Sequence, residues 1–343
     1  MDIIQIIQST KDLLSNNIEW EERFYRYIQN IAENHSDVKQ RSFRKPEGLS
    51  LYSSVGRQGK SYDLRFRGQS VATVVEKAGT VKLRPKEKNE KYFGFKSREK
   101  ESEWHSEEAS KFRNHFKKEA QKFTKETFKT DRKRPKSKEH RIENCLLREF
   151  SKKLSTGKAL CNIQPIRLYD LFFQMPTPLK ASTHKPEYQQ KGGGGIDILA
   201  RVKPIKGISR ICVMEVKDEN KSSESQAATM TQAVTYAVFI AHLLRSKSGQ
   251  HWWDFFMGRT LEVAKKDDRS IQINVVKKMP KSIDIDVVTI MPEGKTEEFC
   301  NKDIPLKELD VTLHCHSLYY DDKEFQRNET FIFSGTYPNQ LRK

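Results

Sequence analysis

The chain has 343 residues, which is enough for a sizeable hydrophobic core and for two domains. Lysine and arginine number 63 against 46 acidic residues, and the net charge of +17 indicates a polyanionic partner, nucleic acid before an anionic membrane. The five cysteines lack C-x-x-C spacing, and neither a signal peptide nor an apolar run of membrane-spanning length is evident, which predicts a soluble intracellular protein, cytoplasmic with the nucleus as the alternative.

The N-terminal part reads as helical and then as a small β unit. Apolar residues recur at three-to-four spacing between residues 2 and 33, which predicts a helix. Between residues 50 and 85 the period changes to two and glycines break the run, so a small antiparallel β unit is expected. Arg65 and Arg67 share the polar face of this unit, where they either contact nucleic-acid phosphates or are solvated.

A charged region and a basic linker come next. An aromatic stripe predicts a long helix from residue 97 to about residue 130. The segment Asp131–Lys138 is basic and broken by proline, which is typical of a linker, so we place a domain boundary between residues 136 and 137. Residues 1–136 are then an accessory region and residues 137–343 the main domain. Three linker residues are predicted to contact nucleic acid: Arg132, Lys133 and Arg134.

An amphipathic helix is predicted from Arg141 to Leu154. Glu143 lies four residues before Leu147, on the apolar stripe, and therefore faces inward, whereas Glu149 lies off the stripe. A strand is expected over residues 166–173, followed by a polar loop and four consecutive glycines at residues 192–195. Glycines let the backbone approach a ligand closely, but no G-K-[ST] sequence follows them, which excludes a P-loop.

Residues 196–202 and 211–217 are predicted to form a hairpin, because both runs are short, rich in β-branched residues and bounded by Gly or Pro. Asp197 opens the first strand, and Glu215 and Lys217 close the second on one face. Two carboxylates at the end of a hairpin can hold Mg²⁺, and a neighbouring lysine can orient a water and stabilise phosphate charge. The alternative is an edge hairpin with solvated charges and one Glu–Lys pair.

Further elements are expected towards the C-terminus. A helix from about residue 225 to residue 245 places Gln232 and Tyr236 on one face. The aromatic residues at 252–256 either form a buried corner or stack on a base, and we expect the buried corner. Strands are predicted over residues 271–276, 283–290, 311–318 and 330–333, with Asp284 and Asp286 on the solvated face of the second.

Asp197 followed by Glu215-Val216-Lys217 resembles the D…(D/E)-x-K signature of the restriction-endonuclease-like, or PD-(D/E)XK, nuclease superfamily. The predicted order of helix, strand, Asp-bearing strand, E-x-K strand and helix also resembles this family, from about residue 137 to the early 240s. Ile196 stands where many members have proline. Gln232 and Tyr236 are similar to the QxxxY element of the RecB-like exonuclease branch.

The resemblance implies an α/β fold, in which a restriction-endonuclease-like core with a mixed central sheet flanked by helices adjoins the N-terminal accessory region. It implies Mg²⁺-dependent hydrolysis of phosphodiester bonds, in DNA rather than RNA, with Mn²⁺ as a substitute. The implied metal ligands are Asp197, Glu215, the Val216 carbonyl and Glu143, with Glu149 as the alternative to Glu143. The implied catalytic residues are Asp197, Glu215, Lys217, Glu143, Gln232 and Tyr236.

Two other functions remain open. One is a non-catalytic nucleic-acid-binding or assembly protein that keeps a nuclease-like core, and the complete set of Asp197, Glu215 and Lys217 argues against it. The other is a nuclease effector whose N-terminal region senses a ligand or a partner. A homo-oligomer or a partner protein is compatible with each of these functions.

Overall fold

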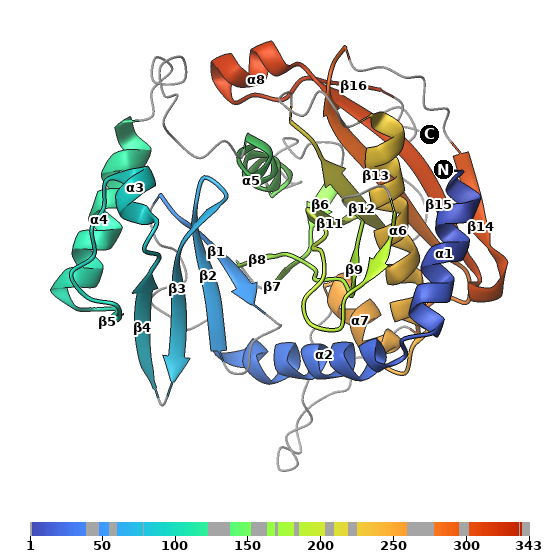
Figure 1. Ribbon diagram of the computed structural model, residues 1–343, viewed down its shortest axis with the longest axis horizontal. Coiled ribbons are helices and arrows are strands. Elements are labelled where there is room, and N and C mark those ends of the chain that lie inside the picture. Colours follow the sequence, from blue (N-terminus) through green and yellow to red (C-terminus); the bar gives the residue numbers. More distant parts are fainter. Residues whose placement is uncertain are drawn as a thin grey trace.

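The computed structural model describes residues 2–38, 48–54, 60–77, 79–122, 138–151, 163–168, 171–181, 185–202, 209–218, 225–258, 278–294, 302–335 and 337. In these residues the chain forms an α/β fold with two seven-stranded sheets placed side by side (Figure 1). The predicted domain boundary at residues 136 and 137, the three basic linker residues and the predicted strand at 271–276 lie outside the described residues.

The first sheet is built mainly from the N-terminal part of the chain. Its consecutive antiparallel strands confirm the predicted β unit and are β1 (Ser50–Ser54), β2 (Lys60–Phe66), β3 (Gln69–Lys77), β4 (Thr80–Pro85) and β5 (Ser102–Glu103). Strand β1 also pairs in parallel with β8 (Leu171–Phe173), which pairs with β7 (Arg167–Leu168). The sheet therefore joins segments from both sides of the predicted boundary.

Two helices line the outer side of the first sheet in Figure 1, α3 (Asn89–Phe93) and α4 (Glu107–Lys122). Phe116 of α4 contacts Phe66 of β2 at 5.2 Å between ring centroids and Phe93 of α3 at 5.6 Å. The part of the predicted aromatic stripe up to residue 122 is thus core packing, in line with its spacing, and the rest lies outside the described residues. The helix begins ten residues later than expected, because β5 and a turn occupy the segment before it.

The second sheet is mixed, with the order β14-β15-β13-β12-β11-β6 and β16 paired to β15. Its strands are β6 (Ile163–Pro165), β11 (Ile198–Val202), β12 (Arg210–Val216), β13 (Ile283–Pro292), β14 (Lys302–Leu306), β15 (Val311–Tyr320) and β16 (Phe333–Gly335). Strands β12, β13 and β15 run parallel, whereas β11 is antiparallel to both β12 and β6. Residues 166–173, predicted as one strand, instead hold the two short strands β7 and β8 of the first sheet, and β6, just before them, belongs to the second sheet.

Strand β12 is buried on both faces, as expected for a strand in a parallel region covered on both sides. Ile211 and Val213 pack into the core shared with α6 (Gln226–Arg245), and Met214 and Val216 pack into the core shared with α5 (Lys138–Phe150). Because side chains alternate along a strand, the residue at 215 points to the same face as Ile211 and Val213.

The helix predicted over residues 2–33 is two helices, α1 (Ile3–Ser15) and α2 (Glu19–Val38). Figure 1 shows α1 beside α6, and α2 running beneath both sheets. Trp20 and Phe24 of α2 contact Phe239 of α6 at 5.7 and 4.9 Å between ring centroids. The N-terminal helices therefore cover the central helix of the second sheet.

Helix α6 is long and apolar enough to cross a membrane by length and composition, unlike what the sequence suggested. However, 78% of its apolar window is buried inside the protein, so here it serves as a core helix. The next helix, α7 (Gly249–Phe256), buries Trp252 and Phe256 completely. The aromatic cluster is thus a corner of the core, as predicted.

Helix α5 lies between the two sheets in Figure 1. Its Asn144 Nδ2 donates to the Tyr52 hydroxyl of β1 over 3.2 Å, while Leu146 packs with the second sheet. The β2–β3 turn touches the start of α5: a Cβ on Gly68 (φ 82°) would lie 2.1 Å from the His140 carbonyl oxygen. Only glycine fits this contact, which fixes α5 against the first sheet.

The remaining elements are β9 (Leu179–Lys180), β10 (Glu187–Tyr188), a 3₁₀ turn (Lys307–Leu309) and α8 (Asp322–Asn328).

Candidate active site

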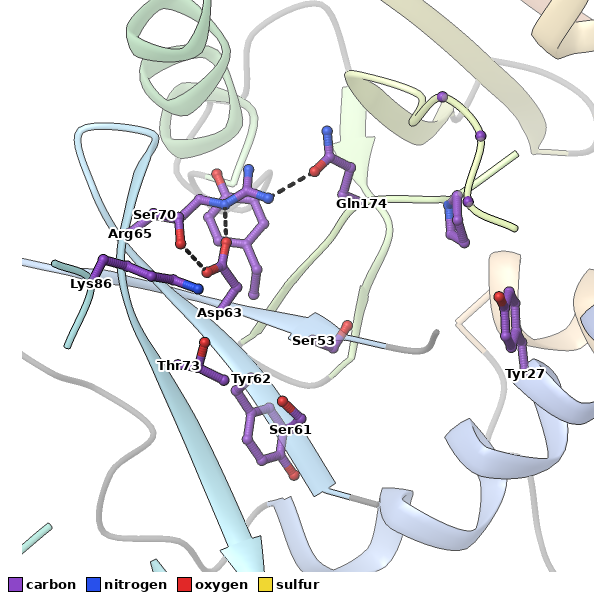
Figure 2. Close-up of a pocket in the computed structure, with 15 residues that line it drawn as sticks. Tyr27, Ser53, Ser61, Tyr62, Asp63, Arg65, Ser70, Thr73, Lys86 and Gln174 are labelled. Atoms are coloured by element: carbon purple, nitrogen blue, oxygen red, sulfur yellow. Dashed lines mark hydrogen bonds and ion pairs between the residues drawn. The ribbon is translucent and has the colours of Figure 1, made fainter. Parts of the chain in front are cut away.

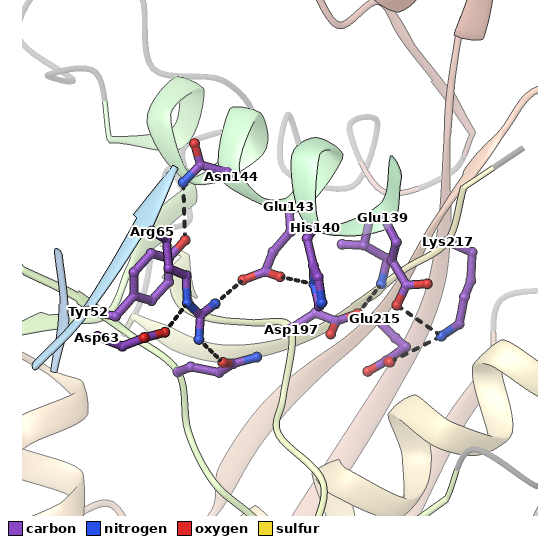
Figure 3. Close-up of polar contacts among 12 residues, drawn as sticks. Tyr52, Asp63, Arg65, Glu139, His140, Glu143, Asn144, Asp197, Glu215 and Lys217 are labelled. Carbon is purple, nitrogen blue, oxygen red and sulfur yellow. Dashed lines mark hydrogen bonds and ion pairs between the residues drawn. The ribbon is translucent and has the colours of Figure 1, made fainter. Parts of the chain in front are cut away.

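The β11–β12 hairpin is antiparallel, as predicted, with Ile198 opposite Met214. This register places Asp197, one residue before β11, next to Glu215 near the end of β12. The backbone N–H of Val216 donates to Asp197 Oδ2 over 2.9 Å (Figure 3). The hairpin therefore brings together the two carboxylates that the sequence singled out.

Lys217 follows β12 directly and is held at both its backbone and its side chain. Its N–H donates to the Ile290 carbonyl over 2.9 Å, and its carbonyl accepts from the Tyr320 hydroxyl over 3.2 Å. Its Nζ lies 3.5 Å from Glu215 Oε1 and 3.6 Å from Glu139 Oε1. Because the Lys217 side chain is only 5% exposed, these two carboxylates fix the position of its charge.

Burial and mutual repulsion perturb both carboxylates of the hairpin. Burial, followed by the charge of Glu143, raises the pKa of Asp197 to about 7. Burial, followed by the charge of Asp197, raises the pKa of Glu215 well above its usual range. Lys217 opposes both shifts without cancelling them. At neutral pH the pair therefore favours either a retained proton or an added positive charge.

The donor set fits a hard divalent cation. Glu215 Oε2 is buried and has no hydrogen-bond partner among the described residues, which is costly unless a cation or proton satisfies it. No group of three or more His, Cys, Asp or Glu side chains in the described part of the chain is arranged to hold a metal ion. Mg²⁺ commonly takes one or two carboxylates and completes its shell with water and substrate phosphate, so two suffice.

Glu143, rather than Glu149, faces this centre. Its carboxylate is 2% exposed and lies 3.5 Å from His140 Nδ1 and 3.9 Å from Arg65 Nη1, whereas Glu149 is half-buried on another side of α5. Hydrogen bonding to Glu143 raises the pKa of His140. Glu143 thus links the hairpin carboxylates to a cation on the first sheet.

Gln232 and Tyr236 lie one turn apart on α6, as predicted. Burial, followed by the charge of Glu215, raises the pKa of the Tyr236 hydroxyl, which is hydrogen-bonded to the Gln232 side chain. A Cβ on Gly194 would lie 2.3 Å from this hydroxyl. In this structure, therefore, the glycine run allows a close approach to Tyr236.

Glu139 and His140 also lie at this site, although neither was predicted from the sequence. Both belong to the first turn of α5, which begins three residues earlier than predicted. Glu139 precedes Glu143 by four residues and so lies on the same helical face. That spacing was the available signal, but the predicted helix began only at Arg141, two residues after Glu139.

The predicted arginines are not equivalent. Arg65 is on β2, whereas Arg67 is in the following turn with φ 50°, so the two do not share a strand face. Arg67 pairs with Glu329 of the turn after α8. Asp286, expected on a solvated face, is buried and bonded to Arg210 and Tyr337, because Tyr337 packs over this part of β13.

No protein-family model, curated protein or solved structure matches this chain.

The raised pKa of Asp197 predicts that metal-free stability falls as the pH rises. Between its ordinary pKa of 3.8 and its folded pKa of about 7, the folded state holds more protons than the unfolded state. The free energy of unfolding therefore decreases with rising pH through this window, by at most about 1.4 kcal/mol per pH unit for one proton. Mg²⁺ favours the ionised form and should reduce the decrease.

The measurement is the melting temperature between pH 5 and pH 7.5, in EDTA and in Mg²⁺. The Asp197→Asn variant is the control, because it cannot ionise and should show a shallower pH dependence in EDTA. Identical profiles for the wild type and the variant would contradict the assignment of the shift to Asp197.

Proposed function

We propose that this protein is a metal-dependent nuclease that hydrolyses phosphodiester bonds, with DNA as the preferred substrate. The observation that carries the proposal is the adjacent pair of half-buried Asp197 and buried Glu215, with buried Lys217 fixed beside it. The chain order of α5, β6, β11, β12 and α6, with β11–β12 antiparallel and β12–β13 parallel, supports a restriction-endonuclease-like core.

Asp197 and Glu215 would hold Mg²⁺, with the Val216 carbonyl as a further ligand and Glu143 in support. Such an ion, when bound, polarises the scissile phosphate and lowers the pKa of a coordinated water. The Val216 N–H bond to Asp197 Oδ2 orients that carboxylate, so its other oxygen is the one available to the ion. Mn²⁺ accepts the same oxygen ligands and should substitute.

The chain's own cation at the centre is Lys217. Glu139 and Glu215 hold its ammonium group within 3.6 Å of each carboxylate. From there it can orient the attacking water and offset the negative charge that develops on the phosphate. Glu139 therefore acts as a positioning residue, because it contacts Lys217 rather than the reacting atoms.

Substrate attraction would come from the whole surface. The net charge of +17 favours phosphate backbones without sequence preference, and such binding weakens steeply with salt. Five residues stay predicted contacts for nucleic acid: Arg132, Lys133 and Arg134 of the linker, and Arg65 and Arg67. Arg65 and Arg67 already have acidic partners, so they are expected to add less than the linker.

The test is cleavage of plasmid, linear, single-stranded DNA and RNA substrates over a titration of Mg²⁺ or Mn²⁺. We expect cleavage that requires the divalent ion, is lost in EDTA and returns when the ion is restored. The matched variants are Glu139→Ala, expected to be slower with unchanged substrate affinity, and Glu149→Ala, expected to match the wild type. A protein that binds these nucleic acids yet cleaves none of them would be a non-catalytic binding protein instead.

A further inference from the structure

A polar cavity of about 510 Å³ lies beside the candidate active site, between strands β1, β2 and β3 and the glycine run at residues 192–194 (Figure 2). Its size falls within the range of roughly 300–1,000 Å³ that is typical of small-molecule sites. It is formed by the N-terminal sheet on one side and by residues of the later chain, including Gln174, on the other.

The cavity wall contains buried hydroxyl groups without partners. Ser53 is 9% exposed and Ser61 is 6% exposed, and the Oγ atoms of both have no hydrogen-bond partner among the described residues. Thr73, from the neighbouring strand β3, lines the same wall and is also buried. Because unsatisfied buried polar groups are costly, an occupant with several hydrogen-bonding groups fits this wall better than an apolar one.

The electrostatics of the cavity favour an anion. Among the described residues that line it, the one carboxylate is Asp63, and it is already engaged: Arg65 Nε donates to Oδ2 over 2.7 Å and Ser70 donates to Oδ1 over 2.5 Å. Lys86 also lines the cavity and is half-buried. The rings of Tyr27 and Tyr62 line it as well and offer surfaces on which a planar group can stack, and the Tyr52 hydroxyl edge completes this side of the wall.

Arg65 connects this cavity to the hairpin carboxylates. Its guanidinium lies over the Tyr52 ring at 3.9 Å, donates to Gln174 Oε1 over 2.8 Å and pairs with Glu143 at 3.9 Å. Glu143 in turn raises the pKa of Asp197. The glycine run also lines the cavity, and Asp197 and strand β11 follow it closely along the chain. Arg65 and Glu143 thus connect an occupant of the cavity to Asp197 of the candidate active site.

We propose that the cavity binds one nucleotide, with its base among the tyrosine rings and hydroxyls and its phosphate near Lys86. The choice of a nucleotide rests on the proposed nuclease function, because the neighbouring site would hold a nucleic-acid strand. Aromatic stacking and hydrogen bonds to a base edge are the usual means of holding an unstacked base. The nucleotide is either the unit of the strand beside the scissile bond or a free nucleotide that acts on the site through Arg65.

The test is calorimetric binding of the four ribonucleoside and four deoxyribonucleoside 5′-monophosphates, and of inorganic phosphate, to the full chain in EDTA. We expect at least one nucleotide to bind more tightly than phosphate. Lys86→Ala should weaken that binding about tenfold, because it removes a charge–phosphate contact. Lys88→Ala removes an exposed charge two residues away and should leave the binding unchanged.

Ser61→Met fills the cavity and should abolish nucleotide binding, with circular dichroism confirming that the variant folds. If that variant does not fold, Lys86→Ala and Lys88→Ala still decide the outcome. Asp197→Ala should bind the nucleotide as the wild type does, which separates this cavity from the proposed metal site. If no nucleotide binds better than phosphate, or if Lys86→Ala binds as the wild type does, the inference is wrong.

A competition experiment distinguishes the two sources of the nucleotide. If the cavity receives a unit of the strand, the free nucleotide displaces a single-stranded oligonucleotide, and Lys86→Ala raises KM for cleavage more than it lowers kcat. If the cavity binds a free nucleotide, the nucleotide changes the cleavage rate without displacing the oligonucleotide. Loss of metal-dependent cleavage would contradict the proposed nuclease function, while the EDTA binding measurement would still report on the cavity.

Discussion

Replacement of Asp197 or Glu215 by alanine is expected to abolish nucleic-acid cleavage while the protein stays folded. Each substitution removes a proposed metal ligand, and a metal site supplies several kcal/mol of transition-state stabilisation. A loss of about 4 kcal/mol corresponds to roughly a thousandfold in rate. The fold should survive, because burial already penalises the charged form of both carboxylates, and Lys217 keeps its ion pair with Glu139 when Glu215 is removed.

Nucleic-acid binding is expected to persist in both variants, because it depends on lysine and arginine contacts to phosphate. Without metal it should even tighten, since one source of repulsion between carboxylate and phosphate is gone. Lys217→Ala should lower the cleavage rate but keep metal binding. The Lys217 ammonium group contacts Glu215 and Glu139 and is not itself a metal ligand.

The measurement is the cleavage rate at saturating Mg²⁺, with circular dichroism and a binding assay for each variant. Glu87→Ala serves as the matched control, because it removes an exposed carboxylate that follows β4 and is not part of the hairpin site. Full activity in folded Asp197→Ala and Glu215→Ala proteins would refute the site assignment. A matching loss in Glu87→Ala would show that the loss is not specific to the hairpin.

Removal of residues 1–136 is expected to prevent the rest of the chain from folding. Helices α1 and α2 cover α6, and without them Phe239 and Trp252 would lose the contacts with Phe24 at 4.9 and 6.2 Å. Strand β8 would also lose its partner β1. Leaving a large apolar side chain exposed instead of buried costs about 1.5–3 kcal/mol, and total stability is only about 5–15 kcal/mol.

The predicted linker at residues 131–138 suggested instead that the C-terminal domain folds alone. Expression of residues 137–343, with far-UV circular dichroism and size-exclusion chromatography, tests it. Trp20→Ala in the full chain is a milder probe of the same surface and should lower the melting temperature without unfolding the protein. A soluble truncated chain with native-like circular dichroism would show that the two parts are separable.

The sequence was most informative where local pattern and chemistry agree. Alternating apolar residues bounded by glycine and proline predicted the β11–β12 hairpin, and alternation alone put Glu215 and Lys217 on one face. The inward position of Glu143 followed from its place on the apolar stripe of α5. Such features depend on neighbours within a few residues, which is the range that periodicity reports.

Contacts between distant segments could not be predicted from local periodicity. Nothing near Arg65 indicates that it pairs with Glu143 or bonds to Gln174, because these partners are 78 and 109 residues away along the chain. The burial of Asp286 depends on Tyr337, and the cover on α6 depends on α1 and α2. Each of these is a tertiary effect that overrides what the local sequence favours.

The parallel pairing of β1 with β8 also has a consequence for how the chain is made. Tyr52 of β1 lies opposite Phe172 of β8. The edge of β1 that pairs with β8 therefore stays unpaired until synthesis has proceeded 120 residues further. At about 5–20 residues per second, that is a delay of roughly 6–24 seconds on the ribosome. An unpaired strand edge is a template for wrong partners throughout this time. The N-terminal sheet, although made first, is therefore expected to be completed only after much of the later chain has emerged.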